Sequence, residues 1–140
     1  MTARGEINNN PGNIEYHERT QWRGLANPPV EAKGRFAVFT EPKWGIRAIV
    51  KTLQSYQRQG IRSVRACISR WAPAVENNTK GYIDRVASEM GVSPDEPLDF
   101  HTYAHARGIA TAIMRVELGY APPYSDAVID EALPLAGVTA

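Results

Sequence analysis

The sequence has one cysteine, no long apolar run and almost no excess charge of either sign. With Cys67 as the single cysteine, neither a disulfide nor a cysteine-ligated metal site can form within the chain. No stretch approaches the ~20 apolar residues of a membrane-spanning helix, and the polar beginning Met-Thr-Ala-Arg-Gly-Glu lacks the apolar segment of a signal peptide. We therefore expect no membrane insertion and no export signal.

Charge and motif content exclude several further classes. Sixteen Lys and Arg residues stand against fifteen Asp and Glu residues, without a basic run, which disfavours a nucleic-acid partner. The chain has no internal repeat, no Gly-x-Ser-x-Gly nucleophile elbow and no phosphate-binding Gly-Lys loop. At 140 residues, 43% of them hydrophobic, it fits one domain over residues 1–140, for which we expect no cofactor.

The distribution of turn residues predicts a mainly α (α+β) fold. Residues 5–40 are rich in Gly, Asn and Pro and enclose the short β-like runs Ile14–Tyr16 and Phe36–Phe39, as in a small, irregular, polar β lobe. Residues 41–120 form the predicted helical core, because apolar residues recur there at helical spacing. The C-terminal tail, residues 121–140, holds one weak helix near 125–133.

Capping residues set the expected helix bounds. Four helices are predicted, from Thr40 to Gly60, from Ser63 to Trp71, from Asn77 or Asn78 to Gly91, and from Asp99 to Gly119. Cys67 falls on the apolar face of the second.

Glu117 is the candidate acid of the sequence. Cleaving a glycosidic bond needs a carboxylic acid that stays protonated near neutral pH, and an apolar setting favours that neutral form. Glu117 lies four residues after Ile113, in the last turn of the last long predicted helix, where the helix macrodipole disfavours an anion. Since most helix-end glutamates are merely solvated, the motif around Glu117 must decide between these roles.

Several strings resemble lytic transglycosylases and flagellar-type glucosaminidases of the lysozyme superfamily. Glu117-Leu118-Gly119-Tyr120 is similar to the Glu-Ser-Gly-aromatic element around their catalytic acid. Residues 76–86, from Glu76 to Val86, resemble a transglycosylase helix in which the position of Tyr82 lies beside the catalytic glutamate. The glucosaminidases also carry a series of short sequence motifs that three stretches of this chain resemble: Asn8–Ile14, Trp22–Gly24 and Phe36–Phe39. In combination, residues 4–120 resemble small phage muralytic proteins, with a lysozyme-like fold.

The order of these strings differs from the resembling families. They place the glutamate helix before the Asn-rich lobe, whereas Glu117 follows it here. A circular permutation accounts for the difference, because the termini of domains often lie close together. Glu6, directly before the Asn-rich turn, is the alternative catalytic acid, although five preceding residues are too few for the expected helix.

The resemblance implies cleavage of peptidoglycan glycan strands, as a muramidase or a lytic transglycosylase, with Glu117 and Tyr82 as the catalytic residues. Polar and aromatic side chains expected to bind substrate are Asn9, Asn10, Asn13, Trp22 and Tyr120. The asparagines equally suit turn geometry around Pro11-Gly12. Trp44 is a further stacking candidate, and Trp71, before Ala72-Pro73, is expected to be structural.

The step after protonation depends on a second carboxylate, for which Glu15, Glu18 and Glu31 are the candidates. If none reaches the sugar, the muramic 6-hydroxyl would attack instead, as in the lytic transglycosylases that the chain resembles.

Other functions remain open. The competing class is a non-catalytic virion or tail protein that keeps the fold for glycan binding or for assembly with other virion proteins. Either protein would act in the phage virion or at the host periplasm and cell wall. His101 and His105 have the spacing of two zinc ligands, but Thr102 stands where a zinc hydrolase helix carries glutamate, and we expect no metal.

Overall fold

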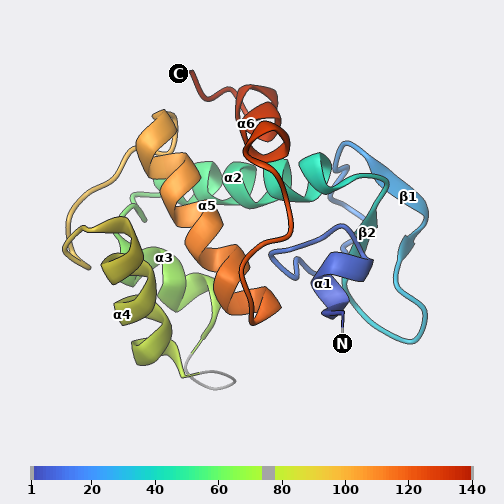
Figure 1. Ribbon diagram of the computed structural model, residues 1–140, viewed down its shortest axis with the longest axis horizontal. Coiled ribbons are helices and arrows are strands. Elements are labelled where there is room, and N and C mark those ends of the chain that lie inside the picture. Colours follow the sequence, from blue (N-terminus) through green and yellow to red (C-terminus); the bar gives the residue numbers. More distant parts are fainter. Residues whose placement is uncertain (1, 74–77, 140) are drawn as a thin grey trace.

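The computed structural model describes residues 2–73 and 78–139 of the chain (Figure 1). The described elements are α1 (Arg4–Ile7), β1 (Leu25–Val30), β2 (Ala37–Phe39), α2 (Pro42–Arg58), α3 (Val64–Trp71), α4 (Thr79–Met90), α5 (Tyr103–Leu118) and α6 (Asp126–Leu135). The predicted class, mainly α with a small β lobe at the N-terminal side, is confirmed. Glu76 and Asn77, used in the sequence comparison, lie outside the described residues.

The lobe is a two-stranded sheet with long irregular connections. Strand β2 matches the predicted run at Phe36–Phe39 and pairs antiparallel with β1, Leu25 facing Phe39 and Val30 facing Ala37. Strand β1 was not predicted because it contains Pro28 and Pro29, which cannot donate backbone hydrogen bonds and are tolerated only at a sheet edge. The predicted strand at Ile14–Tyr16 is wrong, since only one bridge, from Glu15 to Phe36, forms there.

Two predicted helix starts are confirmed and two are wrong. The Ser63 hydroxyl caps α3 by accepting from the Ala66 N–H, and Asn78 caps α4. Thr40 does not cap α2, because the helix begins at Pro42 with Glu41 in the N-cap position; the Thr40 hydroxyl donates to the Gly24 carbonyl. Helix α5 begins at Tyr103 and not at Asp99, whose carboxylate accepts hydrogen bonds from the Gln57 side chain and the His101 N–H.

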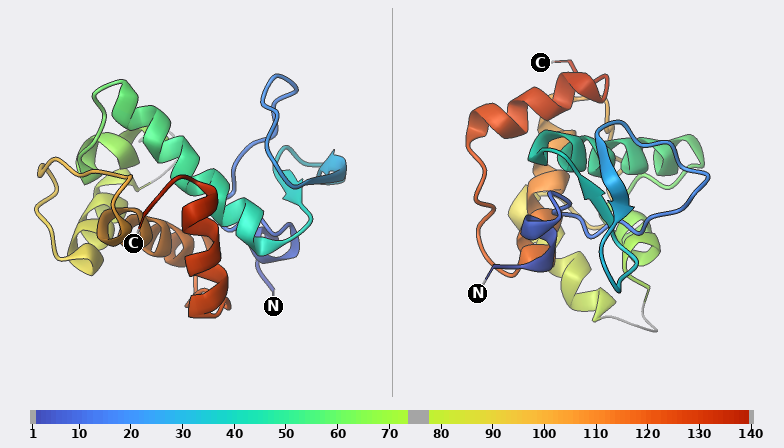
Figure 2. Two further views of the ribbon diagram at one scale, coloured as in Figure 1. Left: turned by 90° about the horizontal axis from the view of Figure 1, so that it is seen from above. Right: turned by 90° about the vertical axis from the view of Figure 1, so that its right-hand side faces the viewer.

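Helix α2 joins the lobe to the helical part (Figures 1 and 2). Its side chains Ile49 and Leu53 are fully buried in the main core, as is Ile113 of α5. Helix α6 extends beyond the predicted weak helix and packs against α2, so residues of the expected tail complete this core. In the described part of the chain, no helix is long and apolar enough to cross a bilayer.

Buried polar groups in the core are few, and they join separate segments. The Gln54 side chain of α2 is 1% exposed and donates to the carbonyls of Phe100 and Ala136. Cys67 is buried on α3 as predicted, and burial raises the pKa of its thiol to about 12. A thiol in this state has almost no thiolate at neutral pH, so it is a packing residue.

Candidate active site

The carboxylate of Glu117 is held between two donors from distant parts of the sequence. The Asn13 side-chain amide donates to Glu117 Oε1 at 2.9 Å, and the Tyr82 hydroxyl donates to Oε2 at 2.9 Å. Glu117 lies in the last turn of α5, before Gly119, which ends the helix with a φ of +83°. Three of the residues singled out in the sequence therefore meet at one half-buried carboxyl group.

Tyr82 is a rigid, neutral partner. It lies on α4, 7% exposed, in a core that α4 shares with α5. Burial, and secondarily the negative charge of Glu117, raise the pKa of the Tyr82 phenol well above its ordinary value. The hydroxyl consequently keeps its proton and acts as a hydrogen-bond donor that orients Glu117.

Asn13 reaches Glu117 because the Asn-rich loop is folded tightly. Asn13 has a φ of +51°, in the left-handed region that asparagine tolerates better than most residues. Its Oδ1 atom is buried and has no partner among the described residues. Asn10, which is fully buried, holds the loop: its amide nitrogen donates to the carbonyls of Ile14 and Ala37, and its Oδ1 accepts from the Ile14 N–H.

A second polar contact ties the beginning of the chain to the end of α5. The Tyr120 hydroxyl donates to Glu6 Oε1 at 2.5 Å and accepts from the Ala3 N–H at 2.9 Å. Gly5 lies so close to Leu118 that an added Cβ would stand 3.2 Å from its Cδ2 atom. In space, the helix that carries Glu117 therefore ends where the N-terminal lobe begins.

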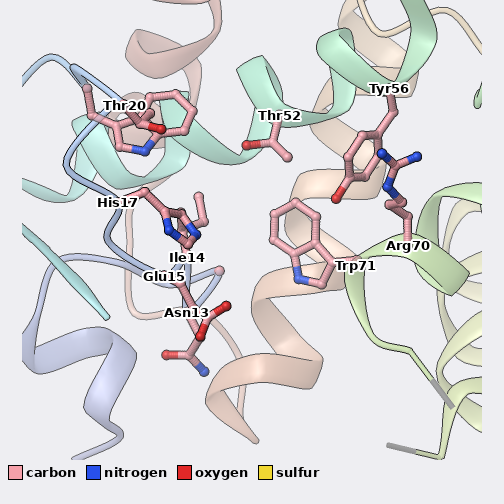
Figure 3. A pocket seen from close by; sticks show the side chains of 11 residues that line it. Asn13, Ile14, Glu15, His17, Thr20, Thr52, Tyr56, Arg70 and Trp71 are labelled. Carbon is pink, nitrogen blue, oxygen red and sulfur yellow. The ribbon is translucent and has the colours of Figure 1, made fainter. Parts of the chain in front are cut away.

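Two cavities flank the Asn13–Glu117 contact. One, of about 390 Å³, lies between α4 and the end of α5 and is lined by Tyr82, Arg85, Arg115 and Glu117. The other, of about 320 Å³, lies between the N-terminal loop and helices α2 and α3 (Figure 3). Asn13 lines this second cavity, and its amide bonds to Glu117 on the wall of the first.

The remaining predicted binding residues have different surroundings. Trp22 lines the second cavity. The amide of Asn9 donates to the Phe39 carbonyl. The side chain of Asn10 is fully buried and its amide is already hydrogen-bonded, so it has no surface for a ligand. The Tyr120 hydroxyl is likewise engaged within the protein, by Glu6.

None of the three loop glutamates hydrogen-bonds to Glu117 or its two partners within the described residues. Glu15 is paired with Arg35 at 2.7 Å, and Glu18 is exposed. Burial opposes ionisation of Glu31, but hydrogen bonds from the Phe36 N–H and the Asn8 amide outweigh it and hold the pKa of Glu31 below its ordinary value. Glu31 is thus an anion, and its hydrogen bonds with Phe36 and Asn8 stabilise the lobe.

His101 and His105 both contact Asp99, shortly before the start of α5. His105 Nδ1 accepts from the Asp99 N–H at 3.0 Å, and His101 Nδ1 lies 3.3 Å from the Asp99 carboxylate. In the part of the chain that the structure describes, no three potential ligand side chains lie together as a metal site.

Sequence reasoning missed Trp71 and Tyr56 as cavity residues. Both line the second cavity, although Trp71 was expected to be structural and Tyr56 also packs against the main core. Their exposure depends on where the N-terminal loop crosses α2 and α3. No local pattern in the sequence encodes that crossing.

Comparison with known proteins places the chain among phage proteins. No protein-family profile matches it. It is 35% identical over 123 residues to Protein P5 of Pseudoalteromonas phage PM2, an alignment that covers 86% of this chain and 74% of the phage protein. This supports the predicted phage origin, and the chain belongs to the same family as the phage PM2 protein P5.

Proposed function

We propose that this chain cleaves the β-1,4 bond between N-acetylmuramic acid and N-acetylglucosamine in peptidoglycan, with Glu117 as general acid and base. One observation carries the proposal: the Glu117 carboxyl group, beside a cavity, accepts one hydrogen bond on each oxygen from Asn13 and Tyr82. Such a group has a fixed orientation. It also keeps free lone pairs, one of which can carry the proton that is given to a leaving oxygen.

The two donors favour transfer of the proton from Glu117 to the leaving oxygen. Hydrogen bonds to a carboxylate are stronger than those to a neutral carboxylic acid. The contacts from Asn13 and Tyr82 therefore strengthen as Glu117 loses its proton and the oxocarbenium-like transition state forms. The resulting carboxylate is then placed to take a proton from the attacking oxygen. Tyr82 acts through Glu117 and is a positioning residue in this scheme.

The surroundings of the loop glutamates favour one source of the attacking oxygen. Glu31 and Glu15 are engaged by other groups of the lobe, and Glu18 is exposed, with no hydrogen bond to Glu117 or its two partners among the described residues. This favours attack by the muramic 6-hydroxyl, which would leave 1,6-anhydro ends, over attack by water activated by a second carboxylate.

Two further features support the proposal. The relative is a phage protein, and a phage-encoded muralytic protein would act on the glycan strands of a bacterial host. The contact of Tyr120 with Glu6 and Ala3 brings the end of the glutamate helix beside the start of the chain, an arrangement that a circular permutation of the resembling families would produce.

The decisive experiment incubates purified murein with the native chain, with Glu117→Gln and, as a matched control, with Glu6→Gln. We expect soluble products from the native chain and from Glu6→Gln only. Mass spectrometry separates reducing muramic ends, which indicate hydrolysis, from 1,6-anhydro ends. Equal product release by Glu117→Gln would remove Glu117 from the role. Glycan binding without products from any variant would favour a non-catalytic, glycan-binding virion protein.

A further inference from the structure

The cavity between the N-terminal loop and helices α2 and α3 has the make-up of a sugar-binding site. Its volume of about 320 Å³ is at the lower end of the range for small-ligand sites. Figure 3 shows Thr52 and Tyr56 of α2 and Trp71 of α3 reaching toward the loop that carries Asn13. These side chains offer one broad aromatic face and several uncharged polar groups.

The polar groups that face this cavity are free to bind a ligand. Tyr56 Oη and Trp71 Nε1 make no hydrogen bond with any residue in the described ranges 2–73 and 78–139. Burial raises the pKa of the Tyr56 phenol, so that its hydroxyl keeps its proton and remains a donor. The Thr52 hydroxyl donates to the Ala48 carbonyl and can still accept.

The charged groups around the cavity are largely satisfied by the protein. Arg70 stacks over the Tyr56 ring at 5.6 Å and donates to the Gln59 side chain. Glu15 is paired with Arg35. The groups left for a ligand are therefore chiefly neutral donors and acceptors around an aromatic ring, which suit an uncharged polyhydroxylated ring better than an ion.

Backbone packing couples this cavity to Glu117. A Cβ atom on Gly12 would stand 3.0 Å from Trp71 Cζ2 and 2.7 Å from Ile49 Cγ1, so only glycine lets the loop lie against the indole. The next residue, Asn13, lines the cavity and donates to Glu117. A ring bound beside Trp71 would thus lie next to the group that holds the candidate acid.

We propose that this cavity is a glycan subsite that binds one N-acetylhexosamine ring, stacked on Trp71 and hydrogen-bonded by Tyr56 and Thr52. The choice of sugar rests on the proposed function, since the same glycan would have to reach Glu117. The subsite itself requires no turnover, so the two proposals can fail separately.

The test uses the full chain with Glu117→Gln, labelled with ¹⁵N in its three tryptophan indoles. The probes are chitotetraose and peptide-free glycan strands prepared from murein. We expect either probe to shift the Trp71 Nε1–H resonance, assigned with Trp71→Phe, and to leave that of Trp44 unshifted, since Trp44 packs in the lobe outside this cavity.

Affinity measurements on variants complete the test. Trp71→Ala is expected to weaken binding about tenfold and Tyr56→Phe, which keeps the ring, about threefold. Trp44→Phe should bind with unchanged affinity, because the structure places this stacking candidate of the sequence against the cluster around Phe39 and outside the cavity. The subsite is refuted if neither probe shifts Trp71, or if folded Trp71→Ala and Tyr56→Phe both bind as tightly as their parent. Binding at Trp71 by a chain that releases no murein products would uphold the subsite and refute the enzymatic proposal.

Discussion

The Asn13 amide donates a hydrogen bond to Glu117, a residue 104 positions later in the chain. The contact joins the loop of the β lobe to the end of α5, between the two cavities that flank the candidate acid. A single loop conformation thus decides both the orientation of Glu117 and the shape of the proposed glycan subsite.

Substituting Tyr82→Phe removes the donor to Glu117 Oε2 and keeps the ring in the core. We expect kcat for murein cleavage to fall about tenfold or more with little change in KM, because a hydrogen bond to a charged group contributes roughly 1.5 to 3 kcal/mol. The matched control is Tyr124→Phe, which deletes a buried hydroxyl that has no partner in the described part of the chain. It should leave activity unchanged and stability equal or higher. Equal kcat values for the two variants would contradict the role of Tyr82.

Substitutions at Asn13 distinguish the amide from the backbone conformation. Asn13→Gly removes the donor to Glu117 but tolerates a φ of +51°, so activity should fall and the melting temperature should drop only by what the lost hydrogen bond contributes. Asn13→Ala removes the same donor and adds strain, costing about 1 kcal/mol of unfolding free energy in addition. Asn13→Asp should be the least active, because it sets a second carboxylate beside Glu117. Native activity in Asn13→Gly would exclude this amide from the mechanism.

Gly12→Ala tests the close contact between the loop and α3. The added Cβ would press on Ile49 and Trp71, and such overpacking typically costs about 1 to 3 kcal/mol. We expect a lower melting temperature and weaker binding of chitotetraose, measured by titration of the folded protein. Gly60→Ala is the control for a glycine with a positive φ but open surroundings, and should destabilise the chain without changing affinity. A Gly12→Ala chain with unaltered affinity would argue against coupling between the loop and the cavity.

Glu31 should make the stability of the lobe dependent on pH. Its pKa in the folded chain is lowered from 4.5 by hydrogen bonds and by the charge of Arg4, which together overcome the opposing effect of burial. A carboxyl group with a depressed folded pKa stabilises the fold above its unfolded pKa, and this contribution disappears as pH falls through the folded pKa. The free energy of unfolding of the native chain should therefore exceed that of Glu31→Gln by about 1 to 2 kcal/mol at pH 7. The difference should shrink below pH 4.5, as denaturant titrations would measure; a gap independent of pH would be inconsistent with an ionised Glu31.

The helical part of the fold was largely predictable from local sequence. Periodic apolar residues located α2 to α5, and the bounds of α3 and α4 followed from Ser63, Asn78 and Gly91, because capping depends on groups within one turn. Thr40 is not the cap of α2, because the helix starts one residue later, after Glu41, and the Thr40 hydroxyl donates to the Gly24 carbonyl. The Asp99 carboxylate accepts from Gln57 and His101 instead of capping α5. Competing tertiary partners of this kind leave no trace in a local pattern.

For the candidate site, the sequence by itself determined which residue types were available: a glutamate at a helix end, a tyrosine on an apolar face and an asparagine in a turn. The resemblance already implied that Tyr82 lies beside Glu117, as the structure has it. Only the tertiary structure decided that Asn13 joins them, and that Asn10 and Glu31 serve the lobe instead. It also placed Trp71, which was expected to be structural, in the wall of a cavity. The physical reason is that secondary structure depends on neighbours within a few positions, whereas a site depends on how distant segments pack against one another.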